Sequence, residues 1–342
     1  MNKLKIMATI FALTLALVSC GGGGSVAVGV ATDNSKASGT YSYVSISGSS
    51  VSIGTVTLDG AGGGTETGLS PTISGPAALT YTSYTDNSIT LDGTMQGNIR
   101  SGGNFIVLSN TNAGSETLVL MVKNSALAEP TATYRTGKFN YDSAASSDAS
   151  IIDIDTQNPS AGNLAWSVVA PAVSSGTSGY MYNTLDGTYL INGTVNSDMA
   201  YGAISPDGQI NIFGDGTTAF DTAVYAAMGL ELPGAGMTNA DLSGTYVLHQ
   251  IMDEALATGP SYRTGRTRIV VDGAGNGTYT ELASSTAGTL SSGAFTYTVS
   301  ANGSFVVTGL AEGFVLADGS VMVLVDHNAT DDNVDIQVGV RQ

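Results

Sequence analysis

Few side chains in this sequence have the chemistry of a catalytic centre. The 342 residues include two histidines, His249 and His327, and one cysteine, Cys20. Zinc sites and Cys–His nucleophile pairs need more of these residues than the chain offers. Phosphate-binding loops and the His-Glu-x-x-His and Gly-x-Ser-x-Gly motifs are also absent from the sequence. We therefore predict no catalytic residues and no cofactor, and we expect the protein not to be an enzyme.

Carboxylates are the remaining candidates for a metal site. Asp153 and Asp155 flank Ile154, so the two acids should share one face of a strand. A second group crowds one turn: Asp326, Asn328, Asp331 and Asp332. Oxygen-rich turns suit Ca²⁺, but neither stretch has the spacing of an EF-hand loop. We interpret both groups as solvated residues of an acidic protein and predict no metal site.

Basic side chains gather in two similar stretches. Arg263, Arg266 and Arg268 stand in YRTGRTR, and Arg135 and Lys138 stand in YRTGK. Such groups would receive an anionic ligand. Charges of this kind also protect a strand against edge-to-edge pairing, and we favour that role. The likeness of the two stretches leaves open where the middle repeat described below begins.

Tyrosines recur at matched places along the chain. One set stands near the start of each repeat: Tyr41, Tyr134 and Tyr246. A second set stands further along: Tyr81, Tyr182 and Tyr297. A row of exposed rings would suit stacking on sugars, but equal spacing in a repeat more simply means one packing position filled three times. We predict that the members of each set are structurally equivalent.

The elements that hold these residues are internal repeats. SGTY occurs at 38–41 and 243–246, and it is followed by the similar glycine-rich stretches at 58–67 and 271–280. A third copy lies between them on the same frame. The predicted units are 38–125, 131–229 and 241–342.

Within a unit, short β-branched and aromatic runs alternate with Asn-Gly, Asp-Gly or glycine-rich steps. About eight strands joined by tight turns predict an all-β chain of three tandem antiparallel meanders, as small barrels or sandwiches. The opening Gly-Thr-Tyr followed by a meander resembles lipocalin-like barrels. A single β-propeller of about six blades is the alternative. Helical periodicity is confined to 221–232, whose equivalent in the last unit reads as a strand.

Composition limits the partners. The formal charge is −17, and 42% of the residues are apolar, which is enough for packed cores. So acidic a surface repels nucleic acid and anionic lipid, and we exclude nucleic acid as a partner.

The N-terminus has the order of features found in export signals. Lys3 and Lys5 precede the apolar run 6–18, which is too short to span a membrane and ends at Ser19-Cys20. Leu-Val-Ser-Cys at 17–20 resembles the lipobox of bacterial lipoproteins. The resemblance implies that 1–19 is a signal peptide and that Cys20 carries the lipid. Residues 20–37 would then be the lipidated cysteine and a glycine-rich tether.

Two functions remain after these exclusions. The first is a lipid-anchored protein of the bacterial cell envelope, at the outer membrane, whose β units have a structural or interaction role toward an envelope protein or glycan. The alternative is a carrier that holds a small apolar or anionic ligand inside a barrel. An eight-stranded barrel is either filled by its own side chains or holds one small ligand, so an interior cavity would favour the carrier.

Overall fold

The computed structural model describes residues 30–48, 50–70, 74–142, 147–156, 163–192, 199–216, 223–234, 236–256, 259–286, 288–327 and 333–342. The predicted signal peptide, Cys20 and three residues of the acidic turn, Asn328, Asp331 and Asp332, lie outside these ranges. Thr32–Gln342 forms one compact unit. Among the described residues, no helix is long and apolar enough to cross a membrane.

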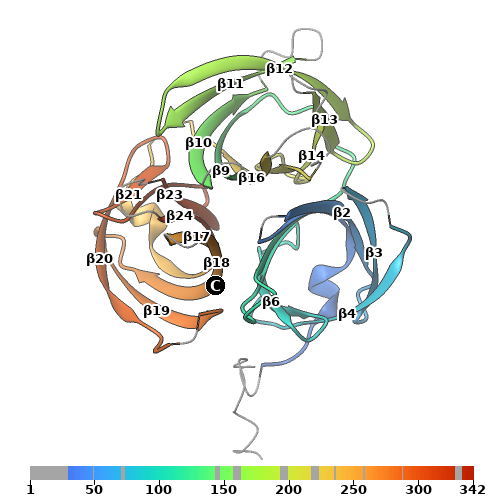
Figure 1. The fold of residues 1–342 in the computed structure, drawn as a ribbon, viewed down its shortest axis with the longest axis horizontal. Helices are drawn as coiled ribbons and strands as arrows, with labels where there is room; N and C mark the ends of the chain where they lie inside the picture. Colours follow the sequence, from blue (N-terminus) through green and yellow to red (C-terminus); the bar gives the residue numbers. More distant parts are fainter. Residues whose placement is uncertain are drawn as a thin grey trace, which may run out of the picture. The chain divides into compact units, whose positions relative to one another are not determined.

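The described strands form three closed antiparallel barrels of eight strands each (Figure 1). In every barrel each strand pairs with the next along the chain, and the last strand pairs with the first. The prediction of an all-β chain with three antiparallel units is confirmed. Closure selects barrels over sandwiches, and the six-bladed propeller is wrong.

Barrel 1 consists of β1 (Gly39–Ser47), β2 (Ser50–Leu58), β3 (Gly63–Ser70), β4 (Ala77–Ser83), β5 (Ser88–Leu91), β6 (Met95–Ile99), β7 (Phe105–Asn110) and β8 (Thr117–Lys123). Barrel 2 consists of β9 (Thr133–Asp142), β10 (Asp148–Asp155), β11 (Asn163–Ala170), β12 (Ser174–Asn183), β13 (Thr188–Asn192), β14 (Met199–Ile204), β15 (Ile210–Asp215) and β16 (Ala223–Glu231). Barrel 3 consists of β17 (Gly244–Leu256), β18 (Gly259–Val271), β19 (Asn276–Ser284), β20 (Ser292–Val299), β21 (Ser304–Val307), β22 (Ala311–Val315), β23 (Val321–Asp326) and β24 (Asn333–Arg341).

These strands answer two questions that the sequence analysis left open. In the stretch 221–232, the described residues form β16 and no helix. YRTGK lies on β9, the first strand of its barrel, whereas YRTGR lies on β18, a second strand. The two basic stretches are therefore not equivalent positions of the repeat.

A short 3-10 helix precedes the first strand of barrels 1 and 3. These helices are η1 (Asn34–Ala37) and η2 (Asn239–Leu242). Ala37 and Leu242 are fully buried and join the interior cores of their barrels. Residues 34–37, which the sequence analysis assigned to the tether, therefore belong to the folded part of the chain.

The first set of tyrosines occupies one packing position, as predicted. The rings of Tyr41, Tyr134 and Tyr246 are completely buried. Each hydroxyl donates a hydrogen bond to the carbonyl of a glycine in the turn between the sixth and seventh strands: Gly103, Gly208 and Gly319. All three glycines have a positive φ near 70°, a conformation that other residues rarely adopt.

The second set is equivalent only in part. The register of the fourth strand on the fifth makes Tyr81 and Tyr297 equivalent, as predicted. The residue at that register in barrel 2 is Tyr180, whereas Tyr182 lies two residues further along. The prediction for Tyr182 is wrong because the connection between β13 and β14 is longer in barrel 2, and this shifts the apparent frame.

Four apolar cores stabilise the fold. Three lie inside the barrels, and the fourth, the shared core, lies between them. The shared core is formed by outward-facing residues of the strands on either side of each barrel's closure, such as Val44 of β1, Phe139 of β9 and Val323 of β23. A fully buried side chain of this size contributes about 1.5–3 kcal/mol. The barrels are therefore held together by burial and not by charge pairs alone.

Two glycines allow the barrels to approach closely at this core. A Cβ on Gly137 of β9 would lie 2.8 Å from Val325 of barrel 3. A Cβ on Gly214 of β15 would lie 2.7 Å from Val44 of barrel 1. Real Cβ atoms do not approach so closely, so any side chain at these positions would push the barrels apart.

Candidate functional site

Two facing interior positions hold residues of different size in the three barrels. The position on the first strand holds Tyr43 in barrel 1, Thr136 in barrel 2 and Leu248 in barrel 3. The position directly opposite on the last strand holds, in the same order, Met121, Gly229 and Gly339. The facing pair is thus bulky in barrel 1 and small in barrel 2, and neither Thr136 nor Gly229 is among the residues that line the cavity described next.

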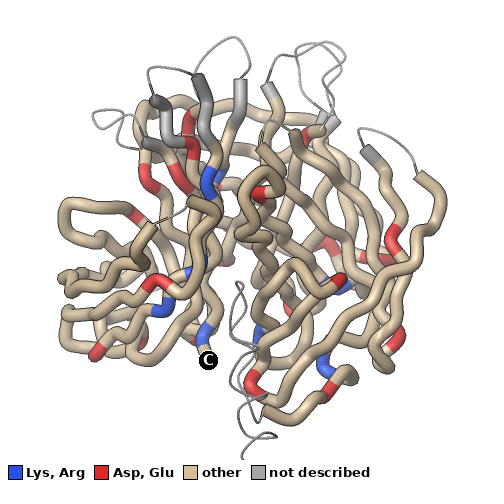
Figure 2. The backbone as a smooth tube through the Cα atoms, turned by 60° about the horizontal axis from the view of Figure 1, so that its bottom comes forward, with Lys and Arg blue, Asp and Glu red and all other residues tan. Residues whose placement is uncertain are grey.

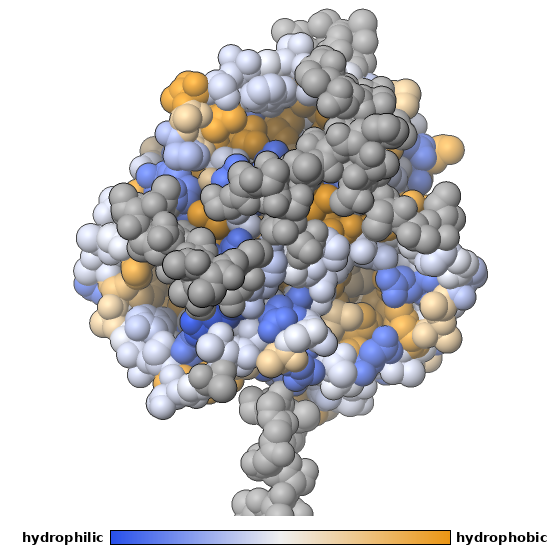
Figure 3. Space-filling model, in the orientation of Figure 1, coloured by the Kyte–Doolittle hydropathy of each residue, from blue (hydrophilic) through white to orange (hydrophobic). Residues whose placement is uncertain are grey.

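Barrel 2 contains an interior cavity of about 590 Å³. Its apolar walls come from β10, β11 and β13: Ile152, Ile154, Leu164, Val168 and Ile191. Pro171 and Ala172, at its outer end, are exposed, so the cavity reaches the surface. Apolar surface gathers in a hollow over this barrel, at the top of the view in Figure 3. Cavities of this size accommodate typical small-molecule ligands.

Aromatic rings form part of the cavity wall. Trp166, the only tryptophan of the chain, lines the cavity from β11, and its Nε1 donates a 3.2 Å hydrogen bond to Ser178. Phe213 of β15 and Tyr225 of β16 also line the cavity. Their ring centroids lie 6.1 Å apart, and their planes are nearly perpendicular. These flat apolar surfaces favour a ligand that contains a ring.

One cation lines the cavity. Lys138 points inward from β9, and its Nζ lies 4.1 Å from the centroid of the Tyr225 ring. Asn140 and Asp148, nearer the rim, are joined by a 3.5 Å contact. The sequence grouped Lys138 with Arg135, but the structure separates them: Arg135 points out of the barrel. Lys138 is therefore the member of that stretch that can meet a bound anion.

A cluster of tyrosines forms part of the interior core of barrel 2. The rings of Tyr180 and Tyr189 lie 5.4 Å apart, and those of Tyr180 and Tyr182 lie 6.1 Å apart. Burial, and then the charge of Glu129, raise the pKa of Tyr182 to about 12, so its hydroxyl stays protonated at neutral pH. Within the described residues, the buried hydroxyl oxygens of Tyr180 and Tyr182 have no hydrogen-bond partner.

The predicted acidic and basic candidates do not form a shared site. Asp153 and Asp155 face outward, opposite Ile154, as predicted. Asp153 forms a two-bond ion pair with Arg135, at 2.8 Å for both bonds. Arg263 pairs with Glu281 at 2.9 Å in the mouth of barrel 3.

The remaining candidates are two arginines of YRTGRTR and the described residues at the acidic turn. Arg266 and Arg268 pair in register with outward-facing residues of β17, so YRTGRTR is not a single anion site. Asp326 and His327 are both half-buried. Among the described residues, no group of three His, Cys, Asp or Glu side chains is placed to hold a metal ion. Acidic residues are spread over all three barrels instead (Figure 2).

His249 is buried between barrels 1 and 3. Its Nδ1 lies 2.9 Å from the hydroxyl of Ser109, and its Nε2 lies 2.9 Å from Oδ1 of Asn98. Burial, and then the charge of Arg266, lower the pKa of His249 to about 3, so the ring is neutral. A serine on a neutral histidine has the groups of a nucleophile–base pair. All three side chains are almost fully buried and line neither interior cavity, so we assign them a structural role.

Arg100 joins one turn from each barrel. Its side chain is only 6% exposed. It donates to Asp207 (2.6 Å) and Gln209 (2.5 Å) of barrel 2, and to Asp318 (2.9 Å) and Ser320 (2.8 Å) of barrel 3. The three turns are equivalent in the repeat, since each connects the sixth strand to the seventh. Arg100 is therefore a polar clamp and is fully engaged by the protein itself.

Comparisons with known proteins do not show a family for this chain. No family model and no curated protein sequence matches the chain. Transferrin Binding Protein B of Haemophilus parasuis is 11% identical, with a TM-score of 0.32, 86% of this chain covered and 65% of that chain. The corresponding protein of Neisseria meningitidis is 11% identical, with a TM-score of 0.30 and coverages of 86% and 66%.

A protein of unknown function from Nostoc punctiforme is 7% identical, with a TM-score of 0.21; the match covers 63% of this chain and 97% of that one. The chain thus spans just under two thirds of the length of the two transferrin-binding proteins. Because a fold hosts many functions, the function of this chain has to be argued from its own residues.

Proposed function

We propose that the protein is a binding protein for a small ligand, which it holds inside barrel 2. The ligand has an apolar body with a ring and carries one anionic group. The observation that carries this proposal is the interior cavity of about 590 Å³, with Trp166 and Tyr225 on its walls and Lys138 beside them. Of the two functions left open by the sequence, an interior cavity favours the carrier.

The chemistry of the lining supports this ligand class. An apolar ring would bury its surface against Ile152 and Trp166, which contributes about 25 cal/mol for each Å² removed from water. A carboxylate or sulfonate would form a charge-assisted hydrogen bond with the Lys138 ammonium. Because the barrel closes on itself, the site is held on rigid strands and needs little rearrangement to bind.

We also propose that the protein is exported and anchored to the bacterial cell envelope through lipid on Cys20. This part rests on the N-terminal sequence: Lys3 and Lys5, the apolar run 6–18 and the lipobox-like end at Cys20. Two or more acyl chains give stable membrane attachment, at about 0.8 kcal/mol per buried CH₂. The binding barrels would then be presented at the membrane surface, where we place their ligand or partner.

Cys20→Ser tests the anchor independently of the barrels. We expect the variant to take up no labelled fatty acid in cells and to leave the membrane fraction, while its purified β domain unfolds at the same temperature. Label that still enters the serine variant would refute the lipidation proposal.

Ser150→Phe tests the binding site. Ser150 points into the cavity from β10, so a phenyl group there fills part of it. Ser167→Phe, on the outward face of β11, is the matched control. In calorimetric titrations with 1-anilinonaphthalene-8-sulfonate, Ser150→Phe should weaken binding at least tenfold and Ser167→Phe should not. Equal affinities of both variants and the unchanged protein would refute the site.

A further inference from the structure

Barrel 3 contains a second, smaller interior cavity. Its volume is about 240 Å³. One end is apolar and is formed by inward-facing residues: Leu248, Ile269, Phe305, Met322 and Leu324. The other end is polar and includes Gln250, Gln337 and Glu281. An engineered apolar cavity of about 150 Å³ in another protein binds benzene, so this one has room for a ring and a few further atoms.

The polar end differs from that of barrel 2 at an equivalent position. Gln250 is the fourth residue after Tyr246, and Lys138 is the fourth residue after Tyr134. Both lie on the first strand of their barrels and point inward. Where barrel 2 places a cation, barrel 3 therefore places a neutral amide. The last strand adds a second amide, Gln337, directly opposite Gln250.

A buried carboxylate orients both amides. Asp335 is 3% exposed, and its Oδ2 accepts hydrogen bonds from Nε2 of Gln250 and, at 3.0 Å, from Nε2 of Gln337. With both amide nitrogens directed at Asp335, the two amide oxygens are the groups left to accept hydrogen bonds. The polar end of this cavity is thus rich in acceptors.

Glu281 adds a further acceptor at the mouth. Its Oε1 accepts from Arg263 at 2.9 Å, and its Oε2 accepts from the backbone N–H and the hydroxyl of Ser291, at 2.7 and 2.8 Å. These bonds hold the carboxylate in place, and Oε1, with one donor, keeps a lone pair for another. The amide oxygens and Glu281 are acceptors, so this end of the cavity favours a guest that donates hydrogen bonds, such as an ammonium, over an anion.

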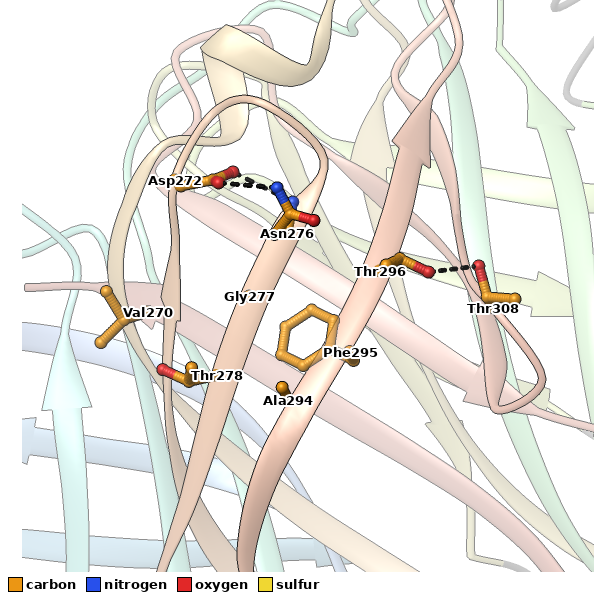
Figure 4. Close-up of a pocket in the computed structure, with 9 residues that line it drawn as sticks. All are labelled: Val270, Asp272, Asn276, Gly277, Thr278, Ala294, Phe295, Thr296 and Thr308. Atoms are coloured by element: carbon orange, nitrogen blue, oxygen red, sulfur yellow. Dashed lines mark hydrogen bonds between the residues drawn. The ribbon is translucent and has the colours of Figure 1, made fainter.

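The wall of the cavity is closed at one side by Phe295. This residue lines the interior cavity and also a depression on the outer wall of the barrel. Its ring lies against Gly277 of the neighbouring strand, where a Cβ would collide with it (Figure 4). The outer depression is lined mainly by short polar side chains such as Thr278 and Thr296. The apolar space suited to a ring is therefore the interior one.

We infer that barrel 3 is a second binding site, for a compact molecule with an apolar ring and an ammonium head that is bound by the oxygens of Gln250, Gln337 and Glu281. This site is separate from the one proposed in barrel 2 and has the opposite charge preference. The protein would then hold two different small molecules at once, one in each barrel.

Titration with 2-phenylethylamine tests this inference, with phenylacetate as the matched anionic probe. We expect the amine to bind the full chain at least tenfold more tightly than phenylacetate does. The amine should also leave the fluorescence of Trp166 unchanged, because Trp166 lines barrel 2. Equal binding of the two probes, no amine binding at millimolar concentration, or a response of Trp166 to the amine would each overturn the inference.

Variants at the equivalent positions locate the site. Gln250→Lys should reduce amine affinity at least tenfold, and Gln337→Met should reduce it several-fold by removing one acceptor. Lys138→Gln, the converse change in barrel 2, should leave it unchanged. Amine binding that depends on Lys138 rather than Gln250 would refute the assignment. Loss of sulfonate binding in barrel 2 alone would leave this inference standing, so the two proposals fail separately.

Discussion

Two buried groups should give the stability of this protein opposing dependences on pH. His249 is buried between barrels 1 and 3, and burial, with the charge of Arg266, lowers its pKa from 6.5 to about 3. Asp335 is buried inside barrel 3, and burial raises its pKa from 3.8 to about 7. Both groups are neutral in the folded protein across the interval from about pH 4 to pH 6.5.

The sign of each contribution follows from which state binds the proton. Between pH 3 and 6.5 the unfolded chain protonates His249 and the folded chain does not, so the stabilisation from His249 is complete above pH 6.5 and is lost as the pH falls. For Asp335 the folded chain holds the proton, so its stabilisation is complete below pH 3.8 and is lost as the pH rises toward 7. Each slope is about 1.4 kcal/mol per pH unit, and in the overlap the two slopes cancel.

Removing one group should uncover the slope of the other. Relative to the unchanged protein, His249→Gln should lose about 2 kcal/mol of unfolding free energy over 1.5 units of rising pH, from 4.5 to 6. Asp335→Asn should gain about the same amount over the same interval. Urea titrations at four pH values measure both differences, and exposed carboxylates cancel because all three proteins share them. Parallel pH profiles for the three proteins would refute this reasoning.

Three further substitutions test the architecture by urea unfolding. Arg100→Met should destabilise the protein by about 2–4 kcal/mol, because it leaves the carboxylates of the facing turns without their partner; a loss below 0.5 kcal/mol would show that the clamp is dispensable. Tyr134→Phe removes one buried hydrogen bond and should cost about 1 kcal/mol, with an unchanged denaturant slope as the check on its fold. Met121→Gly removes a buried side chain from the interior core of barrel 1 and should cost about 3 kcal/mol; a loss below about 1 kcal/mol would show that the core closes over the space.

The fold was predictable because the signals that specify it are local. Alternation of apolar residues, Asp-Gly turns and the matched tyrosines Tyr41, Tyr134 and Tyr246 repeat within each unit, so antiparallel strands and one shared packing position could be inferred. The error at Tyr182 shows the limit: a longer connection in barrel 2 shifts the frame without changing the local pattern. The cavities of barrels 2 and 3 depend on which side chains face inward together, and this follows from the register of strands far apart in sequence, such as β9 and β16.

The polar contacts between barrels could not be predicted from the sequence, because their partners lie far apart along the chain. Asn98 and Ser109 meet His249 from 151 and 140 residues away, and Asp318 meets Arg100 across 218 residues. No local pattern marks these partners as neighbours. The basic stretch YRTGK pointed to Lys138 as a candidate anion contact. Side chains alternate along β9, so Lys138 faces the interior and Arg135 faces outward.

The fluorescence of Trp166 tests the central claim most directly, since the chain has one tryptophan and it lines the barrel 2 cavity. Titration with 1-anilinonaphthalene-8-sulfonate should quench Trp166 emission in a saturable way, with the same dissociation constant as calorimetry gives. Ser150→Phe should abolish this quenching at the same probe concentrations, and Ser167→Phe should retain it. Calorimetric binding with unchanged Trp166 emission would place the probe elsewhere and contradict the proposal that barrel 2 is the ligand site.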